Sequence, residues 1–73
     1  MNSTIYSKEH KHLIKKLKKA RKEAGLSQEQ VAKILGGSQS YISKIEIGQR
    51  KIDIILLKKF AKIYKKNLDF FIK

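Results

Sequence analysis

The sequence predicts an all-α fold, a bundle of five helices with a helix-turn-helix unit at its centre. Apolar residues recur at three- and four-residue spacing in successive segments, which is the period of one helix face. A serine, aspartate or asparagine precedes each of these segments, where its side chain can accept a hydrogen bond from the first helical turn. The chain has no proline, and no segment alternates between apolar and polar residues as a strand does.

Two short helices joined by a glycine turn are expected at the centre of the chain. Ser27 caps the first, and Gln30 completes a capping box three residues later. Gly36 supplies a left-handed turn, Ser38 caps the second helix, and Gly48 can end it. Helix, tight turn and helix is the arrangement that places a second helix in the major groove of DNA. DNA binding is therefore the working hypothesis.

A longer helix is expected before this unit. Ser7 can cap it and Gly25 can stop it. One apolar stripe of this helix is expected to be buried: Leu13, Ile14, Leu17, Ala20 and Ala24. Residues 1–7 show no periodicity and are expected to form a flexible tail, so the folded domain is predicted to be residues 8–73.

Two more helices are expected after the central unit. Asp53 can cap a helix that runs to about Lys65, and Asn67 can cap a last short helix at residues 68–72. The inner face of the fourth helix is expected to hold Ile54, Leu57, Phe60, Ala61 and Tyr64. All connections then have only a few residues, as in compact helical domains.

The charge of the chain favours a polyanion as partner. The 73 residues include 18 lysines and arginines against 6 acidic residues, a formal net charge of +12. Such an excess of positive charge in a short chain favours nucleic acid as the binding partner. Lysines that only keep the domain soluble would give the same net charge. Within residues 27–48 the basic Lys33 and Lys44 are balanced by the acidic Glu29 and Glu46, so the flanking helices carry the excess.

Other classes of function have little support in the sequence. The absence of cysteine excludes a disulfide framework and thiolate metal sites. Because a chain without disulfides suits a reducing compartment, a cytoplasmic, nucleoid-associated location is expected. His10 and His12 stand two residues apart and so point to different sides of a helix, and no metal or other cofactor is expected. No apolar run has the length of a membrane span. No catalytic constellation is evident, and the chain is not expected to be an enzyme.

The central segment LSQEQVAKILGGSQSYISKIEIGQR, followed by LLKKFAKIYKKNLDFF, resembles the lambda-repressor-like (Cro/C1-type, XRE family) helix-turn-helix domain. The resemblance covers about residues 13–71. It rests on S-Q-x-x-x-A at the start of the second helix, on the turn glycine, and on IS-x-I-E-x-G at the end of the third. It implies a five-helix lambda-repressor-like bundle that binds double-stranded DNA and regulates transcription.

The resemblance also implies which side chains contact DNA. Base contacts are implied for Gln39, Ser40 and Lys44. A glutamine amide can form hydrogen bonds with adenine, and a lysine can donate to guanine. The alternative is that these residues are ordinary polar side chains on a solvated helix face. Contacts to the DNA backbone are expected from Gln28, Ser38, Tyr41, Ser43, Gln49, Arg50 and Lys51. Ser38 can instead serve only as a cap, and Tyr41 can instead pack at the domain surface.

A partly buried ion pair is implied between Arg21 and Glu46. The guanidinium fork would hold the carboxylate and fix the third helix against the first. Four positions depart from the pattern of the family, which usually has a polar residue, a proline, a glycine and a β-branched residue where this chain has Ile47, Ile52, Lys65 and Gly37.

The C-terminal part of the chain has more apolar residues than one small core can bury. A homodimer interface is expected at Ile55, Leu56, Ile63, Phe70 and Phe71. Two recognition helices about one DNA turn apart would then bind a palindromic operator, most simply as a repressor. The alternatives are that Ile63 and Phe70 complete the core, that the surface binds a second protein as in an antitoxin, or that the chain binds nucleic acid without specificity.

Overall fold

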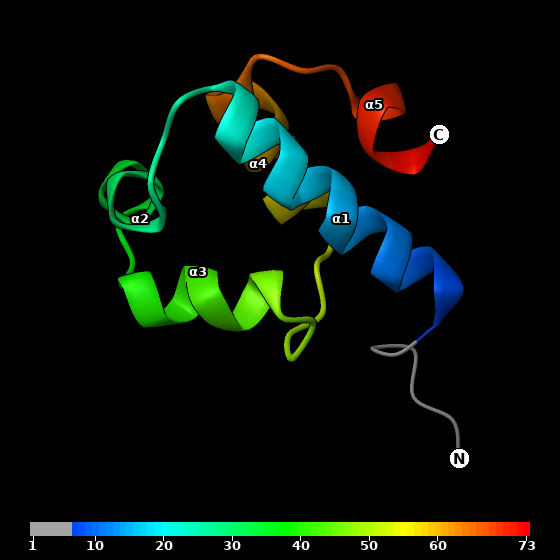
Figure 1. The fold of residues 1–73 in the computed structure, drawn as a ribbon, viewed down its shortest axis with the longest axis horizontal. Coiled ribbons are helices and arrows are strands. Elements are labelled where there is room, and N and C mark those ends of the chain that lie inside the picture. The colour runs from blue at the N-terminus through cyan, green and yellow to red at the C-terminus, as the bar shows by residue number, and fades with distance from the viewer. Residues whose placement is uncertain (1–6) are drawn as a thin grey trace.

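Five α-helices make up the protein (Figure 1). The computed structural model describes residues 7–73, and within that range there is no strand, so the all-α prediction is confirmed. The helices are α1 (Lys8–Glu23), α2 (Gln28–Leu35), α3 (Gln39–Glu46), α4 (Ile54–Tyr64) and α5 (Leu68–Ile72). The expected tail at residues 1–7 lies outside the described residues except for Ser7, which caps α1.

Each helix begins at a side-chain cap. In every case the side-chain oxygen accepts a hydrogen bond from the backbone N–H three residues later, and the caps are Ser7, Ser27, Ser38, Asp53 and Asn67. At the start of α2 the capping box is complete, because the Ser27 N–H also donates to Oε1 of Gln30 at 2.8 Å. Removing such a cap costs about 1 kcal/mol, so these residues define where the helices begin.

The C-cap residue itself is left-handed in two helices, α2 and α4. Gly36 follows α2 with φ of +85°, a conformation that a residue without Cβ adopts at no steric cost. Lys65 follows α4 with φ of 58°, and the N–H of Lys66 reaches back to the carbonyl of Ala61 at 2.9 Å. The chain therefore keeps the cap geometry of a glycine at Lys65, where a side chain costs about 1–2 kcal/mol.

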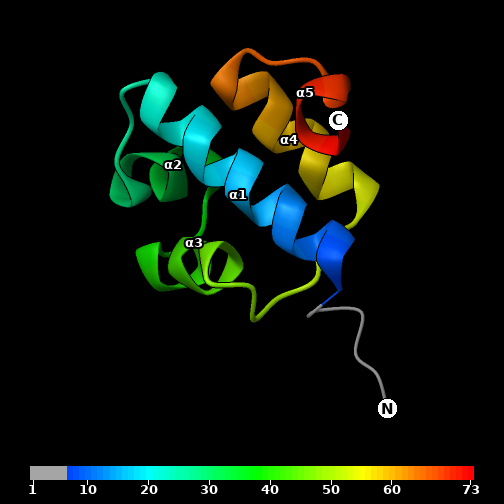
Figure 2. The same ribbon diagram turned by 45° about the vertical axis from the view of Figure 1, so that its right-hand side comes forward.

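Helix α1 lies in the middle of the bundle. Figure 2 shows α4 and α5 on one side of α1 and α3 on the other, and α2 packs beside α3. Every helix contributes to one core, whose largest fully buried side chains are Leu17, Val31, Ile42, Ile45, Phe60 and Phe71.

Three expectations about burial are wrong. Phe71 is fully buried, because α5 packs back on α1 and inserts this ring into the core, so it is not available to a dimer interface. Ile54 is 56% exposed, because the buried face of α4 begins only at Leu57. Ala24 is exposed, because it is the C-cap residue beyond the last turn of α1.

Candidate nucleic-acid interface

Helix α3 presents a polar face at the surface of the bundle. Ile42 and Ile45 are fully buried and fix this helix against α1 and α2. Gln39 and Ser40 in the first turn, and Lys44 one turn after Ser40, are exposed. The structure thus brings the three residues expected to contact bases onto the outer side of a single helix, eight residues long.

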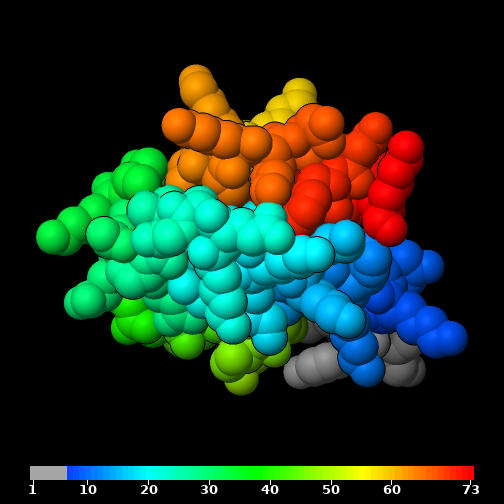
Figure 3. Space-filling view, turned by 45° about the horizontal axis from the view of Figure 1, so that its top comes forward, coloured from blue at the N-terminus to red at the C-terminus, as the bar shows by residue number. Residues whose placement is uncertain are grey.

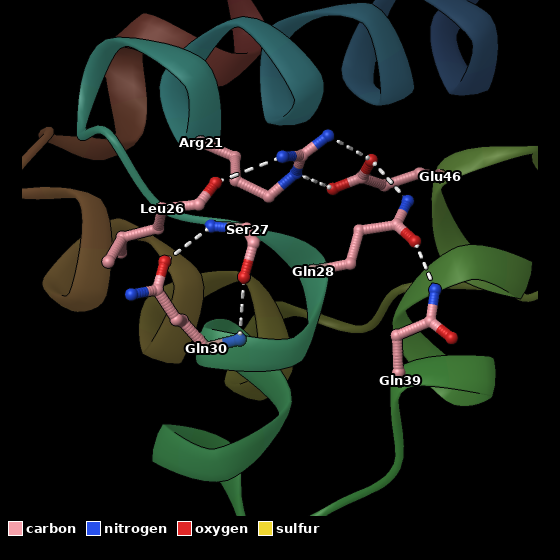
Figure 4. Close-up of polar contacts among 7 residues, drawn as sticks. All are labelled: Arg21, Leu26, Ser27, Gln28, Gln30, Gln39 and Glu46. Atoms are coloured by element: carbon pink, nitrogen blue, oxygen red, sulfur yellow. Dashed lines mark hydrogen bonds and ion pairs between the residues drawn. The ribbon is translucent and has the colours of Figure 1, made fainter.

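An ion pair holds the last residue of α3 against α1 (Figure 4). Arg21 donates from Nε to Glu46 Oε2 at 2.8 Å and from Nη2 to Glu46 Oε1 at 3.1 Å. Its third nitrogen, Nη1, donates to the carbonyl of Leu26 at 3.0 Å. The side chain of Glu46 is only 4% exposed. The hydrogen bond to this carboxylate raises the pKa of Arg21, so the guanidinium keeps its charge.

The buried carboxylate of Glu46 is also the first member of a series of hydrogen bonds that ends at the surface of α3. Gln28 Nε2 donates to Glu46 Oε1 at 3.0 Å, and Gln28 Oε1 accepts from Gln39 Nε2 at 2.6 Å (Figure 4). Arg21, Glu46, Gln28 and Gln39 therefore form one polar chain across three helices. Spacing along the sequence does not predict the links made by Gln28, because they depend on how α2 and α3 cross.

The charge of Glu46 fixes the direction of every amide in the polar chain. A carboxylate only accepts hydrogen bonds, so the NH2 group of Gln28 must face it and the carbonyl oxygen of Gln28 must face Gln39. Gln39 in turn directs one N–H inward. In the part of the chain that the structure describes, nothing bonds its second N–H or its oxygen, which leaves one donor and one acceptor at the exposed start of α3.

A family model described as helix-turn-helix matches residues 17–71, from within α1 to within α5. The chain belongs to the Cro/C1-type helix-turn-helix family. Members of this family are DNA-binding regulatory domains and not enzymes, and the chain is a DNA-binding transcriptional regulator of this type. A comparison with curated proteins gives no match.

The helix-turn-helix domain places further polar groups around α3. Ser38 Oγ accepts from the N–H of Tyr41 at 3.2 Å, which leaves its hydroxyl hydrogen free to donate. The Arg50 guanidinium lies over the ring of Tyr41, 5.4 Å from its centroid. This cation–π contact, which the sequence does not predict, holds Arg50 back beside the first turn of α3. Gln49 and Lys51 are exposed in the same loop, while Ser43 is half-buried.

The structure shows the surroundings of three of the residues that depart from the family pattern. A Cβ built on Gly37 would lie 3.6 Å from Cδ2 of Tyr41, so glycine is not required there by lack of space. Ile47 is 62% exposed at the C-cap of α3. Ile52 is half-buried and packs against the core, so an apolar side chain takes the place of a rigid proline.

Between residues 7 and 73, no group of three or more histidine, cysteine, aspartate or glutamate side chains is arranged to hold a metal ion. In the same part of the chain, no helix is both long enough and apolar enough to cross a membrane.

Proposed function

We propose that this helix-turn-helix domain binds a short palindromic operator as a homodimer and represses transcription by occupying a promoter. The observation that carries the proposal is the polar chain, which holds the exposed Gln39 amide in one orientation at the start of α3. A side chain held in one orientation loses little conformational entropy when it binds, and it discriminates between bases by geometry.

Base recognition is assigned to Gln39, Ser40 and Lys44. The free donor and acceptor of Gln39 match N7 and N6 of adenine, and the ammonium of Lys44 can donate to O6 and N7 of guanine. The hydroxyl of Ser40 can serve either as donor or as acceptor. All three are exposed on α3, which is consistent with a helix that enters the major groove.

Backbone contacts are assigned to the groups that surround α3. Gln28 keeps a second N–H at the N-terminus of α2, where the helix dipole favours an anion. Further donors on the α3 side of the domain are Ser38, Tyr41, Ser43, Gln49, Arg50 and Lys51. These contacts would position α3 in the groove without selecting a sequence.

The homodimer interface is assigned to the apolar side chains of α4 and α5 that are not covered by the rest of the domain. Ile55 is 65% exposed, and Leu56, Ile63 and Phe70 are half-buried at the edge of the core. Covering them with a second copy would remove apolar surface from water and give a two-fold symmetric pair.

A second candidate partner is a different, acidic protein. Ile55 is surrounded on the outer face of α4 by Lys58, Lys59 and Lys62, all exposed. Two copies that meet through this face would bring like charges together, whereas an acidic surface would neutralise them. An antitoxin-like role would use this contact in addition to DNA binding.

Selection of bound duplexes from a random pool tests the proposal. We expect an enriched palindrome with half-site centres about 10 base pairs apart, which is the spacing of one helical turn. Enrichment of no sequence would contradict specific recognition and favour non-specific binding. Sedimentation distinguishes the partners: a dimer at high concentration supports the homodimer, and a persistent monomer contradicts it.

A further inference from the structure

A stripe of lysines runs along the outer face of α1. Its members are Lys8, Lys11, Lys15, Lys18 and Lys22. Their spacing alternates between three and four residues, which places them above one another on a helix. All of them are exposed. At a rise of 1.5 Å per residue, the stripe is about 21 Å long.

The protein itself does not neutralise this stripe. Among residues 7–73, none of its lysines forms an ion pair with a carboxylate. Glu23 near the end of α1 binds Lys66 at 2.8 Å instead. Like charges at these helical spacings repel one another and destabilise the helix, so a bound polyanion would relieve the repulsion.

One part of the stripe lies beside the end of α3. Lys11, Lys15 and Lys18 border a surface hollow whose opposite rim is formed by Ile47 and Gly48. Figure 3 shows that the surface of α1 is open between α4 and α5 above it and the end of α3 below it. These three lysines therefore flank α3 at the end opposite to Gln39.

We propose that Lys11, Lys15 and Lys18 form a phosphate-binding ridge that contacts one DNA strand beside the major groove in which α3 lies. The inference rests on the proposed function, because it places α3 in that groove. The ridge extends from Lys11 to Lys18, which is seven residue steps or about 10 Å of helix. Each lysine of the ridge can neutralise one phosphate of the strand, which gives about three phosphate contacts. The ridge supplies affinity and salt dependence, while α3 selects the sequence.

The lysines of α4 provide a matched control. Lys58, Lys59 and Lys62 are equally exposed, and Figure 2 shows α4 on the side of α1 that faces away from α3. Replacing three lysines by glutamine in either helix changes the net charge by the same amount. Because Lys58, Lys59 and Lys62 surround Ile55 on the proposed dimer surface, both variants are compared on a duplex with a single half-site, which one copy binds without a partner.

The test measures the slope of log affinity against log salt for a duplex that carries one half-site of the selected sequence, so that one copy of the protein binds. The variant with Lys11→Gln, Lys15→Gln and Lys18→Gln is expected to lose about 2.7 from the magnitude of this slope, at about 0.9 for each phosphate. The variant with Lys58→Gln, Lys59→Gln and Lys62→Gln is expected to lose less than about 1. Base preferences should be unchanged in both. The single change Lys15→Gln, with an expected loss of about 0.9, gives the same test if the triple variant does not fold.

Equal slopes for the α1 and α4 variants would overturn the ridge, because charge would then act without regard to position. The wild-type protein separates this outcome from failure of the proposed function. If the wild type selects a sequence but the slopes are equal, only the ridge is wrong. If the wild type selects no sequence, the proposed function is wrong, and the proposal of the ridge is wrong as well because it rests on that function.

Discussion

Gln39 at the exposed start of α3 donates a hydrogen bond to Oε1 of Gln28 at 2.6 Å. Gln28 is in turn bound to the buried carboxylate of Glu46, which Arg21 holds from α1. A surface side chain expected to contact bases is thus connected to the interior through three polar contacts. Its orientation is set before DNA arrives, and this pre-organisation is the basis of the predictions about binding.

Removing Gln28 should weaken specific binding more than non-specific binding. In Gln28→Ala the Gln39 amide loses the partner that orients it, and the phosphate contact assigned to Gln28 is lost as well. We expect affinity for the selected duplex to fall about tenfold or more, and affinity for random duplexes to fall less. Competition titrations measure both. The control is Glu29→Ala at the next position, which is exposed, and a loss equal to that of Gln28→Ala would contradict the role of Gln28.

Removing Arg21 should destabilise the fold. Arg21→Ala leaves the carboxylate of Glu46, 4% exposed, without its charged partner. Breaking such a buried pair from one side costs about 3 kcal/mol or more. Thermal unfolding measures the effect, with Lys22→Ala, an exposed neighbour on α1, as the control. Equal melting temperatures for Arg21→Ala and the parent protein would refute the structural role of the pair.

The contact between Glu23 and Lys66 should make a small part of the stability depend on pH. The hydrogen bond from Lys66 lowers the pKa of Glu23 below its ordinary value of 4.5. A lowered pKa in the folded state means that the contribution is present above the unfolded pKa and is lost as pH falls through the folded pKa. The melting temperatures of the parent and Glu23→Gln should therefore differ slightly at pH 7 and converge in acid. A difference that grows in acid would contradict this sign.

The two adjacent glycines of the turn should respond differently to alanine. Gly36 has φ of +85°, so Gly36→Ala should cost about 1 kcal/mol of stability from backbone strain. At Gly37 a Cβ meets only Tyr41 Cδ2 at an ordinary 3.6 Å, and Gly37→Ala should be neutral or should stabilise by about 0.5 kcal/mol. Denaturant unfolding compares the two. The assignment of the left-handed turn to Gly36 would be wrong if Gly37→Ala were the more damaging change.

The helices could be predicted because their signals are local. Each cap acts on an N–H three residues later, and each apolar stripe follows from the helical period. The burial of Phe71 is not determined locally, since it depends on whether α5 folds back on α1. The surplus of apolar residues near the C-terminus predicts a surface position for this residue instead. Lys65 shows the converse case, in which tertiary packing imposes a left-handed cap that the residue type disfavours.

The candidate site was predictable in its residues and only partly in its contacts. The resemblance to a family indicates Arg21, Glu46 and the exposed residues of α3 by position. It does not indicate that Gln28 joins Glu46 to Gln39, because Gln28 lies 18 residues from Glu46 and 11 residues from Gln39 along the chain. It also does not indicate that Arg50 lies over Tyr41, a contact that depends on the path of the loop after α3.

The measurement that tests the central claim most directly is the base preference of Gln39→Ala at each position of the selected duplex. The structure holds the free donor and acceptor of Gln39 at the start of α3, so we predict that the variant loses discrimination at one adenine position in each half-site. Discrimination there should fall by about 1–3 kcal/mol, while preferences at the other positions remain. A profile identical to that of the wild type at every position would contradict the claim that α3 recognises DNA through this side chain.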